Sequence, residues 1–410
     1  MSSRSQATVA QAALSPPVVN VFLTLLPITL AVFVSFLTIG LPLPVLPLQV
    51  SGTLGMSPLV VGVVIGAQFA AALLSRSWAG NLSDTRGAKR AVITGLLFAS
   101  ASGVAYQASL AFASPVASVW MLLLGRVLLG CGESLIVTGS LSWGIGLVGP
   151  HNAGKVMAWN GMAMYGAYAA GAPLGIAVQG AHGFAGISVA AVVLPLLALT
   201  CMANVRAVAP TAVRRTPFYK VLGMVWRPGL GLALCSVGFG VITAFIALLF
   251  AARDWGNASL AFTVFGLAFI AARILFGHLP DKLGGARVAL ICVVIEALGQ
   301  LLIWGAQSPA VAYAGAALTG FGYSLAFPGF GVEAVRRAPP QSRGLAMGAY
   351  VAFLDMALGI TGPVLGALAG ARGIEAVYLA GAIAVALSAL VALRLLTSGS
   401  KDSAVSREEV

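Results

Sequence analysis

The chain has 410 residues, of which 59% are hydrophobic and only 8% are charged, with a mean hydropathy of +0.98. This composition excludes a soluble globular protein, in which roughly a quarter of the residues carry charge. The formal net charge of +12 does not indicate nucleic acid binding, because the basic residues are spread over short loops between apolar segments. The composition predicts an integral membrane protein with no nucleic acid partner.

Twelve apolar segments follow one another along the chain, and each has the roughly 20 residues that a helix needs to cross the hydrocarbon. Their approximate ranges are 19–48, 57–79, 89–113, 117–147, 153–178, 184–207, 228–252, 258–278, 286–307, 310–334, 343–368 and 373–397. We therefore predict an all-α membrane protein whose twelve transmembrane helices form two six-helix pseudo-repeats.

The longest polar connection inside the chain, residues 208–227, lies between the sixth and seventh segments. It divides the chain into a tail (1–18), a first bundle (19–207), this linker, a second bundle (228–397) and a second tail (398–410). Basic residues gather in the loops on the side of the termini, whereas the opposite loops carry only Arg253 and Arg372. The positive-inside rule thus predicts a bacterial-type inner membrane protein with both termini in the cytoplasm.

A polar motif occurs twice. Residues 80–87 read Gly-Asn-Leu-Ser-Asp-Thr-Arg-Gly and residues 277–284 read Gly-His-Leu-Pro-Asp-Lys-Leu-Gly, at an offset of 197 residues that also carries Arg76 onto Arg273. An aspartate beside a helix start can accept backbone N–H groups and pair with a nearby arginine, which would hold a gate shut. The other interpretation is a plain tight turn. The candidate gating residues are Gly80, Asp84, Arg86, Gly87, Arg90, Gly277, Asp281, Gly284 and Arg287.

A second internal match lies within the apolar segments, at an offset of 190 residues. It carries Gly-Cys-Gly-Glu-Ser-Leu at 130–135 onto Gly-Phe-Gly-Tyr-Ser-Leu at 320–325, and Pro173 onto Pro363. Internal repeats of this kind are typical of secondary transporters, which move one half of the bundle against the other.

The stretch from Gly80 to Arg90 resembles the loop motif of the major facilitator superfamily, Gly-x-Leu-x-Asp-x-x-Gly-x-Lys/Arg-Lys/Arg, and 277–287 resembles its weaker second copy. The sequence departs from the motif at Thr85 and Ala88. The resemblance covers essentially the whole chain. It implies the twelve-helix facilitator fold and transport by alternating access.

Two further patterns extend the resemblance. Arg126, followed by Gly130 and Gly132, resembles the Arg-x-x-x-Gly-x-Gly motif of proton-driven facilitators, in which the arginine influences a titrating carboxylate. The stretch 171–175, Gly-Ala-Pro-Leu-Gly, resembles the Gly-Pro motif of the export branch. The whole pattern is similar to the drug and sugar efflux (proton antiporter) branch, including its YhhS-type subfamily.

Ionisable residues within the apolar segments are the candidate proton-coupling groups, because charges at that depth normally face a cavity or a partner. Arg126 and Glu133 lie seven residues apart on one helix face, and Asp355 lies near the midplane of the eleventh segment. A permanent ion pair, between Arg126 and Glu133 or with partners on other helices, is the alternative. Glu296, in the ninth segment, ranks third because the resemblance places that helix at the periphery.

Four polar residues are candidates for substrate binding. The offset of 190 residues carries Tyr165 onto Asp355 and Glu133 onto Tyr323, so each acid occupies the repeat position of a tyrosine. We expect the two acids and the two tyrosines to line a central cavity, although tyrosines also pack well as amphipathic rings. Gln68 and Asn160 either orient a solute or bond a neighbouring helix.

Helix bends are predicted at Gly171 and Pro173 and at Gly362 and Pro363, because proline removes a backbone donor. The alternative is a packing kink without a role in transport. Residues 149–155 have the spacing of a phosphate-binding loop but continue with Val156, and no strand precedes them. The four cysteines lie apart in apolar segments and are interpreted as buried, so neither a metal site, a cofactor nor an enzyme activity is predicted.

The sequence thus predicts a proton-coupled secondary transporter that exports a small organic solute or drug by alternating access. Its expected partners are that solute, protons and the lipid bilayer, and we expect a monomer. A proton-coupled importer would use the same residues. A non-transporting sensor or scaffold is the alternative from another class, and the carboxylates inside the membrane argue against it.

Overall fold

The computed structural model describes residues 21–149, 152–209, 218–337 and 343–408. Helices account for nearly all of these ranges, which contain no strand, so the predicted all-α class is confirmed. The N-terminal tail and residues 210–217 of the linker lie outside the described residues.

Eleven helices in the described ranges are long and apolar enough to cross a membrane. The long helices are α2 (Val21–Gly40), α4 (Pro58–Arg86), α5 (Ala88–Ser109), α6 (Pro115–Val148), α7 (Ala153–Met202), α8 (Phe218–Ala252), α9 (Ala258–Phe276), α11 (Gly285–Trp304), α12 (Pro309–Arg337), α13 (Arg343–Arg372) and α14 (Ala376–Glu408). Short segments complete the list: α3 (Leu46–Leu48), the π-helix η1 (Gln49–Thr53) and α10 (Leu279–Leu283).

One of these helices, α7, contains two crossings. Its 50 residues would extend about 75 Å if straight, far more than a bilayer is thick. Gly183 breaks it with a backbone conformation outside the helical region (φ 63°, ψ −165°). The part before the break packs against α2, where Gly171 meets Gly40, and the part after it packs against α5, where Ser100 donates to the carbonyl of Val192. The chain therefore makes the twelve crossings that the sequence predicts.

The predicted first segment is shorter as a helix than its apolar run. Helix α2 ends at Gly40, and the remaining apolar residues form a turn followed by α3 and η1. The prolines at 42, 44 and 47 explain this, because each lacks a backbone N–H and disfavours the helical conformation of the residue before it.

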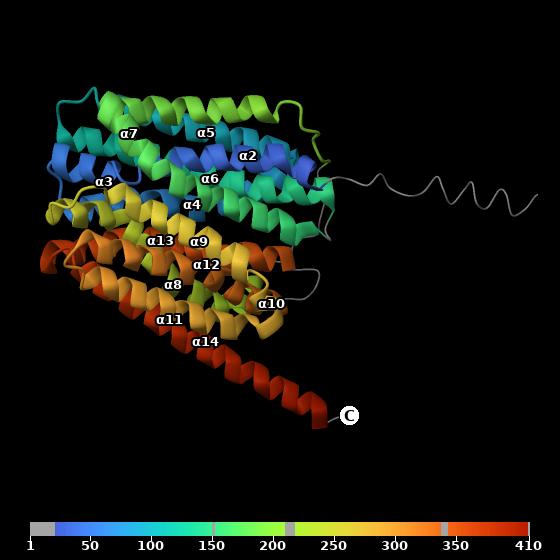
Figure 1. The fold of residues 1–410 in the computed structure, drawn as a ribbon. Coiled ribbons are helices and arrows are strands. Elements are labelled where there is room, and N and C mark those ends of the chain that lie inside the picture. The colour runs from blue at the N-terminus through green and yellow to red at the C-terminus, as the bar shows by residue number, and fades with distance from the viewer. Residues whose placement is uncertain (1–20, 150–151, 210–217, 338–342, 409–410) are drawn as a thin grey trace, which may run out of the picture.

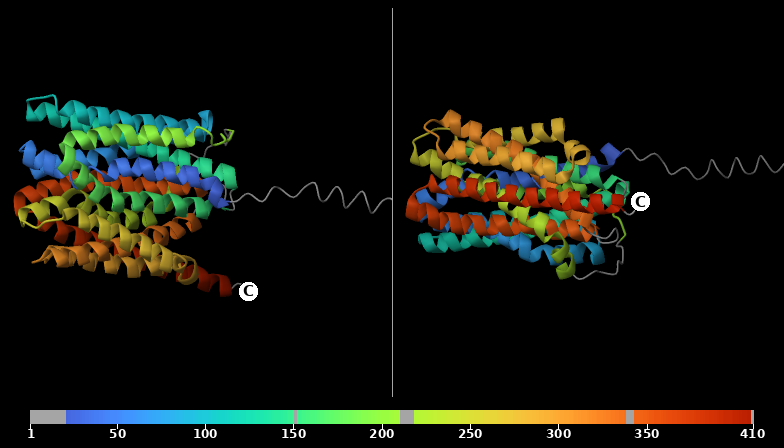
Figure 2. Two further views of the ribbon diagram at one scale, coloured as in Figure 1. Left: turned by 45° about the horizontal axis from the view of Figure 1, so that its top comes forward. Right: turned by 90° about the horizontal axis from the view of Figure 1, so that it is seen from below.

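The long helices run side by side along one direction, and the start of α2 and the end of α14 lie at the same end of the bundle (Figures 1 and 2). An even number of crossings requires this arrangement. The first half of the chain, coloured blue to green, lies beside the second half, coloured yellow to red (Figure 1). Large apolar side chains such as Leu74, Trp120 and Ile274 are exposed on the outside, as expected of helices that face hydrocarbon.

The internal repeat of the sequence is also a repeat of structure. Gly87 and Gly284, 197 residues apart, both have a positive φ (97° and 89°) and both separate one helix from the next. Gly130 packs on the carbonyl oxygen of Gln68, and Gly320 packs in the same way on that of Phe265. Since Phe265 is also 197 residues beyond Gln68, equivalent helices touch at equivalent points in the two halves.

The halves meet along two pairs of helices, α4 with α13 and α7 with α9. Backbones touch at Gly62 and Gly362, where a Cβ on either glycine would overlap the carbonyl oxygen of the other. The second pair is close at Gly266, whose Cβ would overlap that of Ala169. Towards the end that carries the termini this pair separates, because a Cβ at Gly161 would meet only the Nη1 of Arg273, at 3.9 Å.

We predict that Gly362→Ala destabilises the folded protein by about 1–3 kcal/mol, because the new methyl group overlaps the backbone of α4. Gly370→Ala, on the same helix, is the matched control, since nothing lies within 4 Å of its Cβ position. Denaturation of the detergent-solubilised protein measures both. Equal stability of the two variants would contradict the close packing of α4 and α13.

Candidate functional site

The two carboxylates predicted to couple protons lie in the interior of the bundle. Glu133 on α6 and Asp355 on α13 are 8% and 3% exposed, so neither faces lipid. They belong to different halves of the chain, and each lies within the electrostatic field of the other. The candidate site is therefore built around these two acids, at the junction between the halves.

Glu133 is held by a side chain from α4. The Nε2 of Gln68 donates a hydrogen bond of 2.6 Å to the Oε2 of Glu133, and both residues are buried. Gln68, predicted either to orient a solute or to bond a neighbouring helix, thus bonds a candidate coupling acid. Its Oε1 has no hydrogen-bond partner among the described residues, which leaves one polar atom of the site unsatisfied.

Arg126 is fully buried and forms no ion pair with Glu133. Its Nε and Nη2 donate to the backbone carbonyls of Val64 and Ile65 on α4, each at 3.2 Å. Its Nη1 has no partner among the described residues. The permanent Arg126–Glu133 ion pair considered as an alternative is therefore wrong for this conformation, although the charge of Arg126 still acts on Glu133.

Asp355 forms an ion pair that joins the two halves. Arg76 on α4 donates to its Oδ2 from Nε, at 2.8 Å, and from Nη2. The side chain of Asp355 is 4% exposed and that of Arg76 is 15% exposed, so the pair is shielded from solvent. In the sequence, Arg76 marks a repeat position and was not among the predicted site residues. Its position within an apolar segment was the signal that could have identified it as functional.

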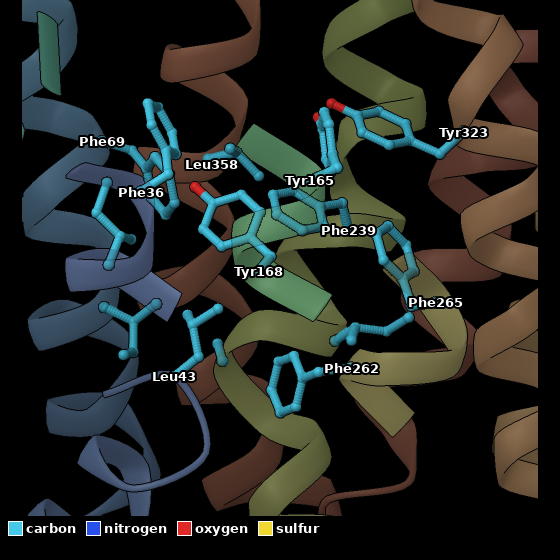
Figure 3. Close-up of a cluster of buried hydrophobic side chains, with 14 of the residues drawn as sticks. Phe36, Leu43, Phe69, Tyr165, Tyr168, Phe239, Phe262, Phe265, Tyr323 and Leu358 are labelled. Carbon is cyan, nitrogen blue, oxygen red and sulfur yellow. The ribbon is translucent and has the colours of Figure 1, made fainter. Parts of the chain in front are cut away.

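Aromatic rings from both halves fill the space beside the acids. Tyr165 stacks on Phe269 of α9 with ring centroids 3.7 Å apart, and its ring lies 6.1 Å from that of Tyr323 on α12. Phe239 of α8 stacks on Tyr323 at 5.7 Å. Figure 3 shows Tyr165, Tyr168, Phe239 and Tyr323 between helices of the two halves, and the hydroxyl ends of Tyr165 and Tyr323 lie together. The structure thus brings the two predicted tyrosines into one buried cluster.

Glu296 on α11 is separate from this site. It is fully buried, and neither carboxylate oxygen has a hydrogen-bond partner among the described residues. A Cβ on Gly238 of α8 would approach its Oε1 at 2.5 Å, and Gln300, one turn further along α11, donates to the carbonyl of Gly238 at 3.2 Å. The residue packs within the second half, in contact with α8, and not at the junction between the halves.

Most of the repeated polar motif is helical and does not form the loop that the sequence suggests. Helix α4 continues through Gly80 and Asp84 to Arg86, so Asp84 lies in a last turn, four residues before α5 begins. Arg86, Arg90 and Arg287 are exposed, and the side chain of Asp281 lies outside the described residues. Lys89, beside the motif, donates to the carbonyls of Ala203 and Val205, both at 2.8 Å, and so fixes the end of α7.

The remaining candidates contribute to packing. Asn160 donates to the Oγ of Ser140 at 2.9 Å, which joins two helices of the first half. Gly171 packs against α2 and Gly362 against α4, and the one residue of α7 with non-helical backbone angles is Gly183, not Pro173. The cysteines are not all buried as expected, because Cys201 is exposed and Cys131 half-buried.

The twelve crossings and the charged residues enclosed between two repeated halves define a multi-pass membrane transporter. A profile of the Major Facilitator Superfamily matches residues 28–256 and 229–409. The chain belongs to this superfamily.

Bacterial relatives cover nearly the whole chain. An uncharacterized MFS-type transporter of Salmonella typhimurium is 46% identical over 375 residues, which are 91% of this chain and 97% of that protein. One of Burkholderia mallei is 46% identical over 355 residues, 86% of this chain and 87% of that protein.

Solved structures share the fold at low sequence identity. A D-xylose-proton symporter superimposes with a TM-score of 0.72 at 17% identity, covering 90% of this chain and 97% of the symporter. The nucleoside transporter NupG gives 0.71 at 13%, covering 91% and 99%. The human organic anion transporter MFSD10 gives 0.68 at 16%, covering 92% and 100%.

We predict that breaking the buried ion pair from one side, by Arg76→Gln or Asp355→Asn, lowers the free energy of unfolding by about 3–5 kcal/mol, because a charge is left buried without its partner. The double variant should lose less stability than the sum of the losses in the two single variants. The half-exposed Arg253–Glu375 pair is the control, and its single neutralisations should cost about 0–1 kcal/mol. Additive losses at Arg76 and Asp355 in a double-mutant cycle would contradict the coupling.

Proposed function

We propose that this protein is a proton-coupled secondary transporter that exports a small organic solute by alternating access. The observation that carries this proposal is the pair of enclosed carboxylates at the junction, Glu133 from one half and Asp355 from the other. An acid at such a junction experiences different surroundings whenever the halves move. That difference is what couples a proton to a conformational change.

The Arg76–Asp355 pair is the conformational contact of this proposal. It crosses from α4 to α13, so a rocking movement that separates these helices must break it. Protonation of Asp355 removes its charge and with it most of the attraction to Arg76. One proton can therefore weaken a contact that holds the halves together.

Glu133 supplies the second proton site. It lies in the fields of Asp355, Arg76 and Arg126, so a change in the Arg76–Asp355 pair alters the charge that Glu133 experiences. A tenfold difference in its proton affinity between two conformations would bias their equilibrium by about 1.4 kcal/mol. The acids thus form one coupled unit, with Gln68 fixing the carboxylate of Glu133.

The proposal also assigns roles to the two bundles, the linker and the repeated motifs. The bundles 19–207 and 228–397 would move as two bodies, with the linker 208–227 between them and the repeated motifs around Gly87 and Gly284 acting as gating segments at the ends of the helices. The loop charges favour cytoplasmic termini in a bacterial inner membrane. The protein would work as a monomer in the lipid bilayer. The aromatic cluster of Tyr165 and Tyr323 would contact the solute.

Spin labels test the coupling without knowledge of the solute. In a variant without native cysteines, labels at Thr85 and Lys282 report the end with the termini, and labels at Ser114 and Gln307 report the opposite end. All four positions are exposed and lie within two residues of a helix terminus, and Thr85 and Lys282 are repeat equivalents. Lowering the pH should shift the two distance distributions in opposite directions. In Glu133→Gln the pH-induced change in the ratio of the two conformations should be at least about tenfold smaller.

Glu375→Gln, which neutralises a half-exposed carboxylate far from the site in sequence, is the matched control and should respond as the wild type does. An unchanged pH response in Glu133→Gln would remove Glu133 from the mechanism. The direction of transport is tested separately, because an exporter lowers the solute content of cells that express it, whereas an importer raises it.

A further inference from the structure

Arg273 on α9 is a cation at the junction that has no counter-charge among the described residues. Its Nη2 donates to the backbone carbonyl of Ser324 at 2.9 Å, and its guanidinium lies 5.2 Å from the ring centre of Phe269. Its Nε is enclosed and has no hydrogen-bond partner among the described residues. No described carboxylate lies within ion-pairing distance of it.

The internal repeat explains why this charge is not neutralised. The offset of 197 residues makes Arg273 the equivalent of Arg76, and the offset of 190 makes Tyr165 the equivalent of Asp355. Helices α9 and α7 therefore form the counterpart of α4 and α13. Where Asp355 neutralises Arg76, the corresponding position beside Arg273 holds the uncharged Tyr165, whose hydroxyl lies within its electrostatic reach.

Helices α7 and α9 pack less tightly beside Arg273 than further along. A Cβ placed on Gly161 would contact the Nη1 of Arg273 at 3.9 Å, and one on Gly166 would contact described neighbours at 3.8 Å, both ordinary van der Waals distances. The same two helices touch tightly at Ala169 and Gly266. The guanidinium thus lies where the two halves begin to separate.

The surroundings are those of a site for an organic anion. Tyr165 and Tyr323, together with Phe269, provide ring faces on one side, and the hydroxyls of Tyr165, Tyr323 and Tyr350 lie within electrostatic reach of Arg273. Arg273 lies in the last turn of α9, and an enclosed cation without a counter-charge is costly. Guanidinium groups bind carboxylates and phosphates through paired N–H donors.

We propose that Arg273 binds the anionic group, a carboxylate or a phosphate, of the transported solute, with the rings of Tyr165 and Tyr323 against its organic part. This substrate class rests on the proposed transport function. The anion would occupy, in the second half, the place that Asp355 occupies in the first.

Binding to the purified, detergent-solubilised protein tests the proposal with three probes that share one ring: benzoate, phenyl phosphate and neutral benzamide. A bound ligand raises the unfolding temperature in a saturable manner. We expect at least one of the two anions, but not benzamide, to stabilise the wild type. Arg273→Gln should lower the binding affinity for that anion at least about tenfold, and Arg273→Lys should lower it less. Arg372→Gln removes an exposed arginine outside the proposed sites and should bind as the wild type does.

A second variant tests the repeat argument directly. Tyr165→Asp places a carboxylate where the first half has one, so it should neutralise Arg273 and abolish anion binding even though Arg273 is present. Tyr165→Phe keeps a ring and adds no charge, and should still bind the anion. If Tyr165→Asp folds poorly because the ring is lost, the Arg273→Gln and Arg273→Lys pair decides alone.

Three results would overturn the proposal: no stabilisation of the wild type by either anion, equal stabilisation by benzamide, or equal anion binding by the wild type and Arg273→Gln. Comparison of benzoate with phenyl phosphate separates the carboxylate from the phosphate. The measurement uses no gradient and no membrane. Loss of proton coupling in the spin-label experiment with normal anion binding would therefore contradict the proposed function alone, and the reverse result would contradict only the anion site.

Discussion

A charge enclosed within a membrane bundle must find a counter-charge, backbone dipoles or water, and the organisation of this protein follows from how its three interior arginines meet that requirement. Arg126 takes two carbonyls of α4, Arg76 takes the carboxylate of Asp355 across the junction, and Arg273 takes one carbonyl and an aromatic face. Arg126 thus binds within one half and Arg76 joins the two halves. Arg126 and Arg273 each keep one donor without a partner among the described residues, and of these two only Arg273 lies beside the facing helix of the other half.

The two halves share a backbone plan but differ in side-chain chemistry. Gln68 and Glu133 form a polar pair between α4 and α6, whereas the equivalent positions between α9 and α12 hold Phe265 and Tyr323. The glycines that allow these helices to touch are the same in both halves. Duplication therefore preserved the packing at these positions, while the polar pair of the first half is replaced by two rings in the second.

The sequence predicted the features that repeat and depend on apolar length, namely the twelve crossings, the two motif copies and the enclosed acids. It did not predict which partners those acids would have. Arg126 and Glu133 share a helix face, yet Arg126 reaches carbonyls of α4 instead, because pairing depends on where a neighbouring helix lies. The Arg76–Asp355 pair links positions 279 residues apart, a relation that hydropathy and spacing do not contain. Alignment of the repeat had nevertheless already marked both Arg76 and Arg273.

Alternating access requires that both contact surfaces between the halves, α4 with α13 and α7 with α9, rearrange together. The pseudo-twofold relation exchanges these two surfaces, so a charged contact on one surface is expected to have a counterpart on the other. On the first surface Asp355 supplies the counter-charge of Arg76, and in the proposed mechanism its protonation would weaken this contact. On the second surface the arginine is present but the carboxylate is replaced by Tyr165. A solute anion on Arg273 would supply the missing charge, so that a proton loosens one surface while the solute closes the other. Exchange of a proton for a solute would then follow from one difference between the repeats, the tyrosine that stands at the position of the carboxylate.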